Sequence, residues 1–127
     1  MGTMTRKKPA VAAPEVHLPL TPATFQILMA LVDGERHGYA IMTEVAERSA
    51  HAVKLGPGTL YGTLKRLLEA EMVEETEERA DPDNADERRR YYRITPGGMS
   101  VARAEARRLE AVVRTARQKK LLGLEPA

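Results

Sequence analysis

The residues best suited to chemistry lie in one stretch of the chain, from Leu55 to Val73, which reads LGPGTLYGTLKRLLEAEMV. Its leucines recur at steps of three and four and predict one narrow apolar stripe along a helix; they are Leu60, Leu64, Leu67 and Leu68. The opposite face carries small, polar and cationic side chains, namely Thr59, Gly62, Lys65, Arg66 and Glu69. A helix that buries one side and offers such groups on the other suits the major groove of DNA.

Lys65 and Arg66 are the cations on that face. Arg66 is the better candidate for reading a base, because its planar guanidinium can bond bidentately to guanine with roughly 1–3 kcal/mol of discrimination. Lys65 could read a base or hold a phosphate. The alternative for both is an ordinary solvated helix face. Thr59, near the helix start, could contact a base or phosphate, or could cap the helix.

Further candidates for DNA contact surround this helix. Tyr61 could donate to a phosphate or pack its ring against the preceding helix. Tyr39 stands at the start of that preceding helix, where phosphate binds well, although a half-buried tyrosine is the other interpretation. Lys54, in the intervening turn, could hold a phosphate. Gly62 costs its helix about 1 kcal/mol against alanine and would let DNA approach closely.

The charges are unevenly placed although the net charge is only +2, with 20 basic and 18 acidic residues. Local fields matter more than the sum for binding a polyanion, but charge runs are usually only solvated faces. A basic cluster contains Arg88, Arg89 and Arg90, which could grip flanking phosphates. Just before it lies an acidic stretch with Asp81, Asp83, Asp86 and Glu87. Phosphate should repel this stretch, so any contact is expected from the three arginines.

The elements that must position these residues follow from periodicity and punctuation. A first helix is expected from Thr21-Pro22, an N-cap followed by proline, to Gly34; its apolar face would hold Phe25, Leu28, Met29 and Val32. A second helix is expected from about Gly38 to Ser49, with His37 ordering the turn before it. After the third helix the period changes to two over 73–78 and 88–95, which predicts two strands joined by a loop at 81–87. Three helices followed by a two-stranded ribbon make a winged helix-turn-helix, a mainly α fold with a small β-ribbon.

A long final helix is expected from Thr95-Pro96 to about Leu122. Apolar residues recur along it at steps of three and four, which favours packing against another helix, but over less than three heptads. The helix could pack on its own domain or pair with a second chain. We favour pairing, because a compact three-helix core does not need so long an extra helix. The predicted dimer interface comprises Ala102, Ala106, Leu109, Val113 and Ala116.

Composition bounds the remaining possibilities. With 127 residues, 43% of them hydrophobic, the chain can form one domain with a core, and that core must be aliphatic because only 4% of residues are aromatic. The absence of cysteine excludes disulfides and thiolate chemistry. No signal peptide or membrane span is expected, so the protein is predicted to be cytoplasmic. The histidines are scattered and no catalytic arrangement of side chains is evident, so no metal, cofactor or enzymatic activity is expected.

The expected organisation is a disordered basic arm at 1–17, a DNA-binding domain at 18–97, a dimerisation helix at 98–122 and a tail at 123–127. Three ordered blocks within it resemble the PadR-like transcriptional regulators; they are HGYAI from His37, GTLY from Gly58 with LKRL from Leu64, and RRYYRITPG from Arg89. This resemblance implies a dimeric winged-helix repressor whose last helix forms much of the dimer interface. It also allows an apolar or phenolic small-molecule effector.

The chain departs from that family's pattern at two positions. Glu71 stands where a glycine often ends the third helix with a left-handed residue, and Gly62 stands where proline often follows the Leu-Tyr pair. The leading alternative function is a winged helix that binds only protein, with its arginine-rich last helix on an acidic partner. The acidic stretch at 81–87 is the feature that favours this alternative.

Overall fold

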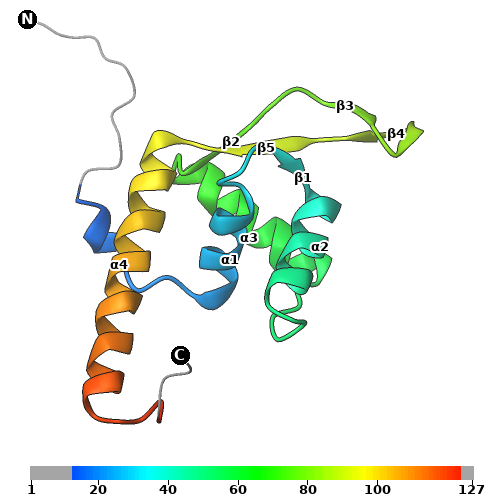
Figure 1. The fold of residues 1–127 in the computed structure, drawn as a ribbon. Coiled ribbons are helices and arrows are strands. Elements are labelled where there is room, and N and C mark those ends of the chain that lie inside the picture. Colours follow the sequence, from blue (N-terminus) through cyan, green and yellow to red (C-terminus); the bar gives the residue numbers. More distant parts are fainter. Residues whose placement is uncertain (1–12, 124–127) are drawn as a thin grey trace, which may run out of the picture.

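The computed structural model describes residues 13–123, apart from the side chains of residues 85–87. In chain order the elements are the 3-10 helix η1 (Pro14–His17), α1 (Pro22–Ala30), β1 (Arg36–His37), α2 (Gly38–Arg48), α3 (Pro57–Glu69), β2 (Val73–Glu75), β3 (Arg79–Asp81), β4 (Asn84–Arg89), β5 (Tyr91–Ile94) and α4 (Pro96–Gln118). In Figure 1, α1, α2 and α3 form a central unit, the β-ribbon extends over α2, and α4 lies on the other side. This arrangement confirms the predicted mainly helical winged helix-turn-helix with a long final helix.

The leucine stripe of α3 forms the centre of the core. Leu60, Leu64 and Leu67 are buried there together with residues of the neighbouring helices, including Ile27, Leu28, Leu31, Ile41, Val45 and Val101. Each such side chain contributes about 1.5–3 kcal/mol on burial. Because the buried stripe faces α1 and α2, the opposite face of α3 must point to solvent.

The end of α1 lies earlier than predicted. Thr21 caps the helix as expected, its hydroxyl accepting from the Thr24 amide at 3.1 Å. The helix ends at Ala30 rather than Gly34, because the following amides bond to carbonyls three residues back and tighten the chain into turns. The predicted apolar face is therefore wrong in part, since Met29 and Val32 are exposed while Ile27 and Leu31 are buried.

The wing contains more strand than the sequence suggests. Antiparallel pairing gives one sheet in the order β1-β5-β2 and a second sheet of β3 and β4. The predicted loop at 81–87 is wrong: the turn is confined to Pro82 and Asp83, and β4 begins at Asn84. The two-residue β1 was not predicted, because a strand of that length has no periodicity to detect.

The turn that ends α3 contains a left-handed glutamate. Glu71 has φ 63°, and the Met72 amide donates to the Leu67 carbonyl at 2.9 Å, as in a Schellman ending. The Thr95 hydroxyl donates to the Glu71 carbonyl at 2.7 Å, and the Thr95 amide to the Met72 carbonyl at 3.0 Å. The helix therefore ends where the family pattern would end it, without the usual glycine.

The first turn of α4 lies directly on this junction. A side-chain carbon built on Gly98 would overlap the Met72 carbonyl oxygen, so only glycine allows the two backbones to approach this closely. Thr95 caps the helix by accepting from the Gly98 amide at 3.0 Å.

The beginning of α4 packs on its own domain. Val101, Ala102 and Ala104 are buried, so the assignment of Ala102 to a dimer interface is wrong; Ala102 belongs to the core of its own chain. The buried Glu105 accepts from the Leu20 amide at 3.2 Å and from Arg108 at 2.6 and 3.0 Å. The Arg108 hydrogen bonds, more than any other contact, lower the pKa of Glu105.

The ends of the predicted segments also differ from the structure. Pro14–His17 form η1 beside α4 rather than part of a disordered arm (Figure 1). Residues 1–12 and 124–127, which include most of the predicted arm and tail, lie outside the described residues. The last helix ends at Gln118 rather than Leu122, because Lys120 turns left-handed at φ 63° and the Leu121 amide donates back to the Ala116 carbonyl at 2.9 Å.

Replacing Glu71 with glycine should stabilise the protein by about 1 kcal/mol, because a residue with a Cβ atom pays roughly 1–2 kcal/mol in the left-handed region. The measurement is the free energy of unfolding from denaturant titration. Glu69→Gly is the matched control: Glu69 is the last residue of α3, where glycine should destabilise by up to about 1 kcal/mol. Equal effects of the two substitutions would contradict the proposed strain at Glu71.

Candidate nucleic-acid interface

The exposed face of α3 carries the predicted contact residues. Thr59, Lys65 and Arg66 are exposed, whereas Gly62 is half-buried. The helix begins at Pro57 with Gly56 as its N-cap, and no side chain caps it. Thr59 is therefore not the cap, and its side chain is available for another contact. The Arg66 guanidinium lies along the helix and donates from Nη2 to the Thr63 hydroxyl at 3.2 Å.

Two exposed tyrosines lie where α2 begins beside α3. The Tyr39 side chain is 60% exposed and that of Tyr61 is 47% exposed. The Tyr61 hydroxyl occupies the space that a Cβ atom on Gly38 would take, so Tyr61 packs against the first residue of α2. The structure thus supports packing of Tyr61 against α2 while much of its ring faces solvent; its contact with a phosphate stays a prediction. Lys54, in the turn between α2 and α3, is also exposed.

The three wing arginines differ in orientation. Arg88 and Arg90 are exposed; Arg88 donates to the Glu78 carbonyl at 3.3 Å, and Arg90 pairs with Glu75 at 3.2 Å. Arg89 points inward instead and pairs with Asp81 at 3.1 Å. Its guanidinium carbon lies 5.9 Å from the centre of the Tyr39 ring. The three arginines therefore do not face the same way, because successive residues of a strand face opposite sides; phosphate contact by all three stays a prediction.

Asp81 is part of the interior rather than of an acidic wing tip. It is 6% exposed and accepts from the Asp83 amide at 2.9 Å and from Arg89. The Asp83 amide first, and Arg89 after it, lower the pKa of Asp81. The side chains of Asp86 and Glu87 are outside the described part. Of the four carboxylates predicted to repel phosphate, Asp81 is therefore buried and paired within the protein.

His37 connects the wing to α2. Its Nδ1 accepts from the Ala40 amide at 3.1 Å and caps α2, as the predicted ordering of this turn implied. Its Nε2 lies 3.9 Å from Asp81, and its ring meets Tyr91 edge-on with the ring centres 5.3 Å apart. Burial lowers the pKa of His37, against the opposing effect of Asp81. The capping bond requires a neutral Nδ1, so a proton there would break it.

A shallow hollow of about 310 Å³ lies between the start of α2 and the wing. Its lining combines carboxylates with cations and one aromatic ring: His37, Tyr39, Glu44, Glu47, Asp81, Asp83 and Arg89. Arg79 fastens the wing beside it, pairing with Glu35 at 2.9 Å and lying 3.8 Å above the Tyr91 ring. Charged and aromatic contacts thus hold the wing beside the segment from Glu35 to Tyr39.

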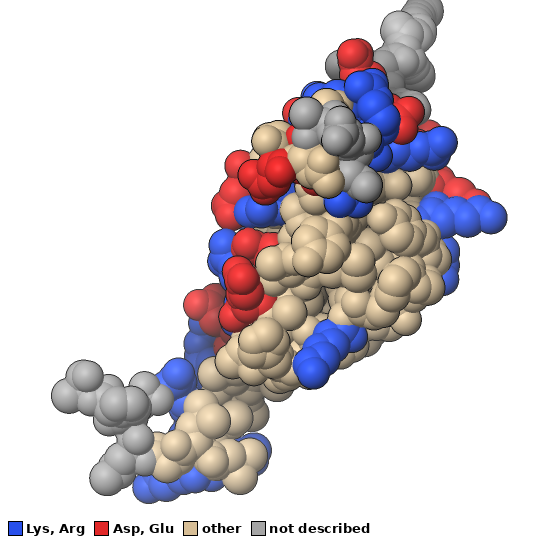
Figure 2. All heavy atoms as spheres, turned by 90° about the vertical axis from the view of Figure 1, so that its right-hand side faces the viewer, with Lys and Arg blue, Asp and Glu red and all other residues tan. Residues whose placement is uncertain are grey.

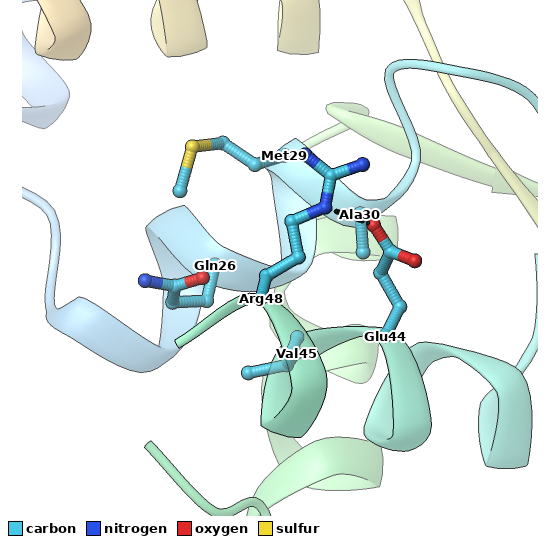
Figure 3. Close-up of a pocket in the computed structure, with 6 residues that line it drawn as sticks. All are labelled: Gln26, Met29, Ala30, Glu44, Val45 and Arg48. Atoms are coloured by element: carbon cyan, nitrogen blue, oxygen red, sulfur yellow. Dashed lines mark ion pairs between the residues drawn. The ribbon is translucent and has the colours of Figure 1, made fainter. Parts of the chain in front are cut away.

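A smaller hollow of about 150 Å³ lies between α1 and α2. Figure 3 shows Ala30 and Val45 at its base, with the Arg48 and Glu44 side chains paired across one side and Gln26 and Met29 along the other. Its volume is close to that of a cavity that accommodates a single benzene ring. This hollow is small and ringed by polar groups, so it is a poor site for a large apolar ligand.

The surface on the wing side is not strongly basic. Figure 2 shows this side of the molecule, and its centre is a broad uncharged area bordered by charged side chains of both signs. Among the described residues, no cluster of three or more His, Asp or Glu side chains could hold a metal ion. No helix within residues 13–123 is long and apolar enough to cross a membrane.

Two buried residues beside the predicted contact arginines were not singled out from the sequence. Thr63 and Asp81 both contact predicted DNA-binding arginines from buried positions. Thr63 lies between Gly62 and Leu64, and a polar residue so close to the apolar stripe is the signal that could have drawn attention to it. Asp81 looked like part of a solvated acidic run, and only the fold shows that it turns inward.

Comparison with known proteins gives one consistent result. The sequence matches the family described as "Transcriptional regulator PadR-like family" over residues 27–104. Transcriptional regulator Rv3488 of Mycobacterium tuberculosis (strain ATCC 25618 / H37Rv) is 41% identical over 88 residues, which cover 69% of this chain and 76% of that protein. A 37.1 kDa protein in transposon Tn4556 of Streptomyces fradiae is 39% identical over 84 residues, which cover 66% of this chain but 22% of that relative's length.

The fold agrees with that match. The crystal structure of a PadR family transcription regulator from Clostridium difficile R20291 superimposes with a TM-score of 0.65 at 24% identity, over 80% of this chain and 98% of that one. At this identity the likeness shows the fold.

The stability of the protein should fall as the pH drops past about 6.5, the ordinary pKa of histidine. Because folding lowers the pKa of His37, the unfolded chain binds the proton more readily, and the loss continues down to the pKa of the folded protein. His37→Asn keeps a good capping residue without a titrating ring, so its free energy of unfolding should change less between pH 7 and 5. The exposed His51, replaced by asparagine, is the control and should keep the wild-type profile. Identical profiles for all three proteins would contradict the role of His37.

Proposed function

The chain belongs to the PadR-like family of transcriptional regulators, and on that premise we propose that it is a homodimeric repressor that reads DNA with α3. A transcriptional regulator of this family binds DNA and is not an enzyme. The observation that carries the proposal is the division of α3 into two faces. Its leucines are buried against α1 and α2, whereas Thr59, Lys65 and Arg66 project together into solvent. This is the arrangement by which a recognition helix enters the major groove.

In this proposal, Arg66 reads a base and the surrounding residues position the protein on the phosphates. Thr59 and Lys65 precede Arg66 on the exposed side of the same helix. The small Gly62 would allow the DNA to come close. Lys54 lies before the helix, and Tyr39 and Tyr61 stand together at the start of α2, where helix dipole and amides favour phosphate. Arg88 and Arg90 would contact the flanking backbone. Arg89 acts indirectly, through its pair with Asp81, by holding the wing in place.

The free half of α4 is the proposed dimer interface. Beyond Glu105 the helix leaves its own domain, yet it keeps apolar residues, with Val112 54% exposed and Val113 42% exposed. Leu109 and Ala116 are partly exposed beside them, and the small, exposed Ala106 would allow a close approach of the partner helix. Pairing of these faces would bury this surface and place the two copies of α3 about one turn of DNA apart.

The proposed dimer suggests how repression and its relief would work. A dimer bound at a promoter would exclude other proteins from it. Because its DNA target lies in the cytoplasm, the regulator would act there. If an apolar or phenolic effector relieves repression, the dimer interface suits it better than the two hollows described above. The first hollow is lined by charged groups and the second holds about 150 Å³. An effector between the free halves of α4 would change the spacing of the two reading helices.

Selection from a randomised duplex library at near-physiological salt tests this function. A two-fold symmetric motif should be enriched, and if six phosphates are neutralised, log affinity should fall against log salt with a slope of about −5. Arg66→Ala should relax base preference at one position of each half-site by roughly 1–3 kcal/mol. Arg90→Ala, its control, should weaken all duplexes alike. If no motif is enriched and weak binding disappears as salt rises, the chain is better explained as a protein-binding winged helix.

Val113→Asp should convert the dimer into a monomer. Two charges would enter a symmetric apolar contact, and the loss of two buried valines at about 1.5 kcal/mol each alone weakens association on the order of 100-fold. Sedimentation analysis at micromolar concentration measures this change. Thr115→Asp is the control, because residue 115 lies on nearly the opposite side of the helix from residue 113 and is exposed. A Val113→Asp protein that sediments like the wild type would contradict the interface.

A further inference from the structure

The buried polar and charged side chains of the described residues are His37, Thr63, Asp81 and Glu105. Three of them hold parts of the fold together: His37 caps α2, Asp81 fixes the wing turn, and Glu105 ties α4 to the chain before α1. Thr63 differs, because its hydroxyl accepts from Arg66 on the exposed face of its own helix. Packing in the core does not by itself explain why a buried hydroxyl bonds to an exposed arginine.

We propose that Thr63 is a positioning residue that orients Arg66 for reading a base. This inference rests on the proposed function of α3. The Thr63 side chain lies among the buried leucines and is 2% exposed, so packing fixes its rotamer. Its hydroxyl reaches the edge of the core, one helical turn before Arg66, and Arg66 Nη2 donates to it at 3.2 Å. A rigid acceptor thus holds one end of a long and otherwise mobile side chain.

The geometry leaves the arginine able to bind. A guanidinium has five N–H donors, and Thr63 uses one of them on Nη2. The other terminal nitrogen, Nη1, lies 3.9 Å from the position that a Cβ atom on Gly62 would occupy. Because residue 62 has no side chain, this side of the guanidinium is not screened by a neighbour on the helix. Thr63 therefore holds Arg66 from beneath, and Gly62 keeps the approach to it open.

An arginine held in this way binds with a smaller loss of entropy. Ordering a side chain rich in rotamers costs part of the interaction energy at the moment of binding. It also lets the planar fork match one base pattern and reject others, since bidentate bonding depends on orientation. If Thr63 served the core alone, valine would fill nearly the same space without a hydroxyl that needs a partner.

The test compares Thr63→Val with Thr63→Ser. Valine should keep or raise the thermal midpoint, because Arg66 is exposed and water can replace the lost bond. It should nevertheless weaken binding to the symmetric duplex recovered by library selection about threefold at each half-site, hence about tenfold in the dimer. Binding to a scrambled duplex should change less than twofold. Serine keeps the hydroxyl but leaves a small void, so it should lower the thermal midpoint and yet restore discrimination.

A double-mutant cycle separates an effect through Arg66 from a general one. In the Arg66→Ala background, Thr63→Val should cause no further loss of discrimination. An equal loss with and without Arg66, or a loss for valine and serine alike, would overturn the inference. In that case the wild type would still select its motif and the proposed function would stand. If the wild type selects no motif at all, the proposed function fails, and this inference fails with it.

Nuclear magnetic resonance of the Arg66 guanidinium in the free protein provides a readout that needs no DNA. The wild type and Thr63→Ser should show a restricted side chain, and Thr63→Val a mobile one. An equally mobile Arg66 in all three proteins would overturn the inference, even if the duplex is selected as expected.

Discussion

The contact between the turn that ends α3 and the first turn of α4 holds the functional parts of this molecule together. Thr95 donates to the carbonyls of Glu71 and Met72 and also caps α4, so one residue joins the end of α3 to the start of the last helix. Gly98 permits the approach because it lacks a Cβ atom. The base of the wing also meets this junction, because β2 begins there and β5 ends there. A shift at this junction would therefore move α3, the wing and α4 relative to one another.

A second set of contacts fixes the outer part of the wing. β1 adds a third strand to the sheet, and the residue that ends it, His37, also caps α2 and faces Asp81. Asp81 in turn holds Arg89, while Arg79 pairs with Glu35 on the segment before β1. Because these bonds involve ionisable groups, they depend on pH and, where they are exposed as at Arg79, on salt.

Periodicity predicted what is long and regular, namely the three core helices, the final helix and the two-strand pattern at the wing base. It did not predict the features that are set by tertiary contacts. The end of α1 depends on tight turns after Ala30 and on Arg36, which donates to the Ala30 carbonyl at 2.7 Å. The split of α4 into a packed half and a free half depends on where the domain ends, and the heptad-like spacing runs through both. Asp81 has one local partner, the Asp83 amide, but its burial also depends on His37 and Arg89, which are distant in the sequence. Residue types thus predicted α3 as the helix that would face DNA, but they did not predict that Arg89 turns toward the protein while Arg66 stays exposed.

The pairing of the wing cations bears on how specificity can arise. Arg79, Arg90 and Arg93 are paired with Glu35, Glu75 and Glu74 in the free protein, so a phosphate must compete with a carboxylate for each of them. The uncharged centre of the wing-side surface adds little attraction of its own (Figure 2). A single chain should therefore hold random DNA weakly, since non-specific binding is mainly electrostatic. Discrimination must come from few base contacts, which raises the value of an arginine already oriented by its own helix. It also raises the value of a second chain, because two weak half-site contacts combine their free energies when one dimer makes both.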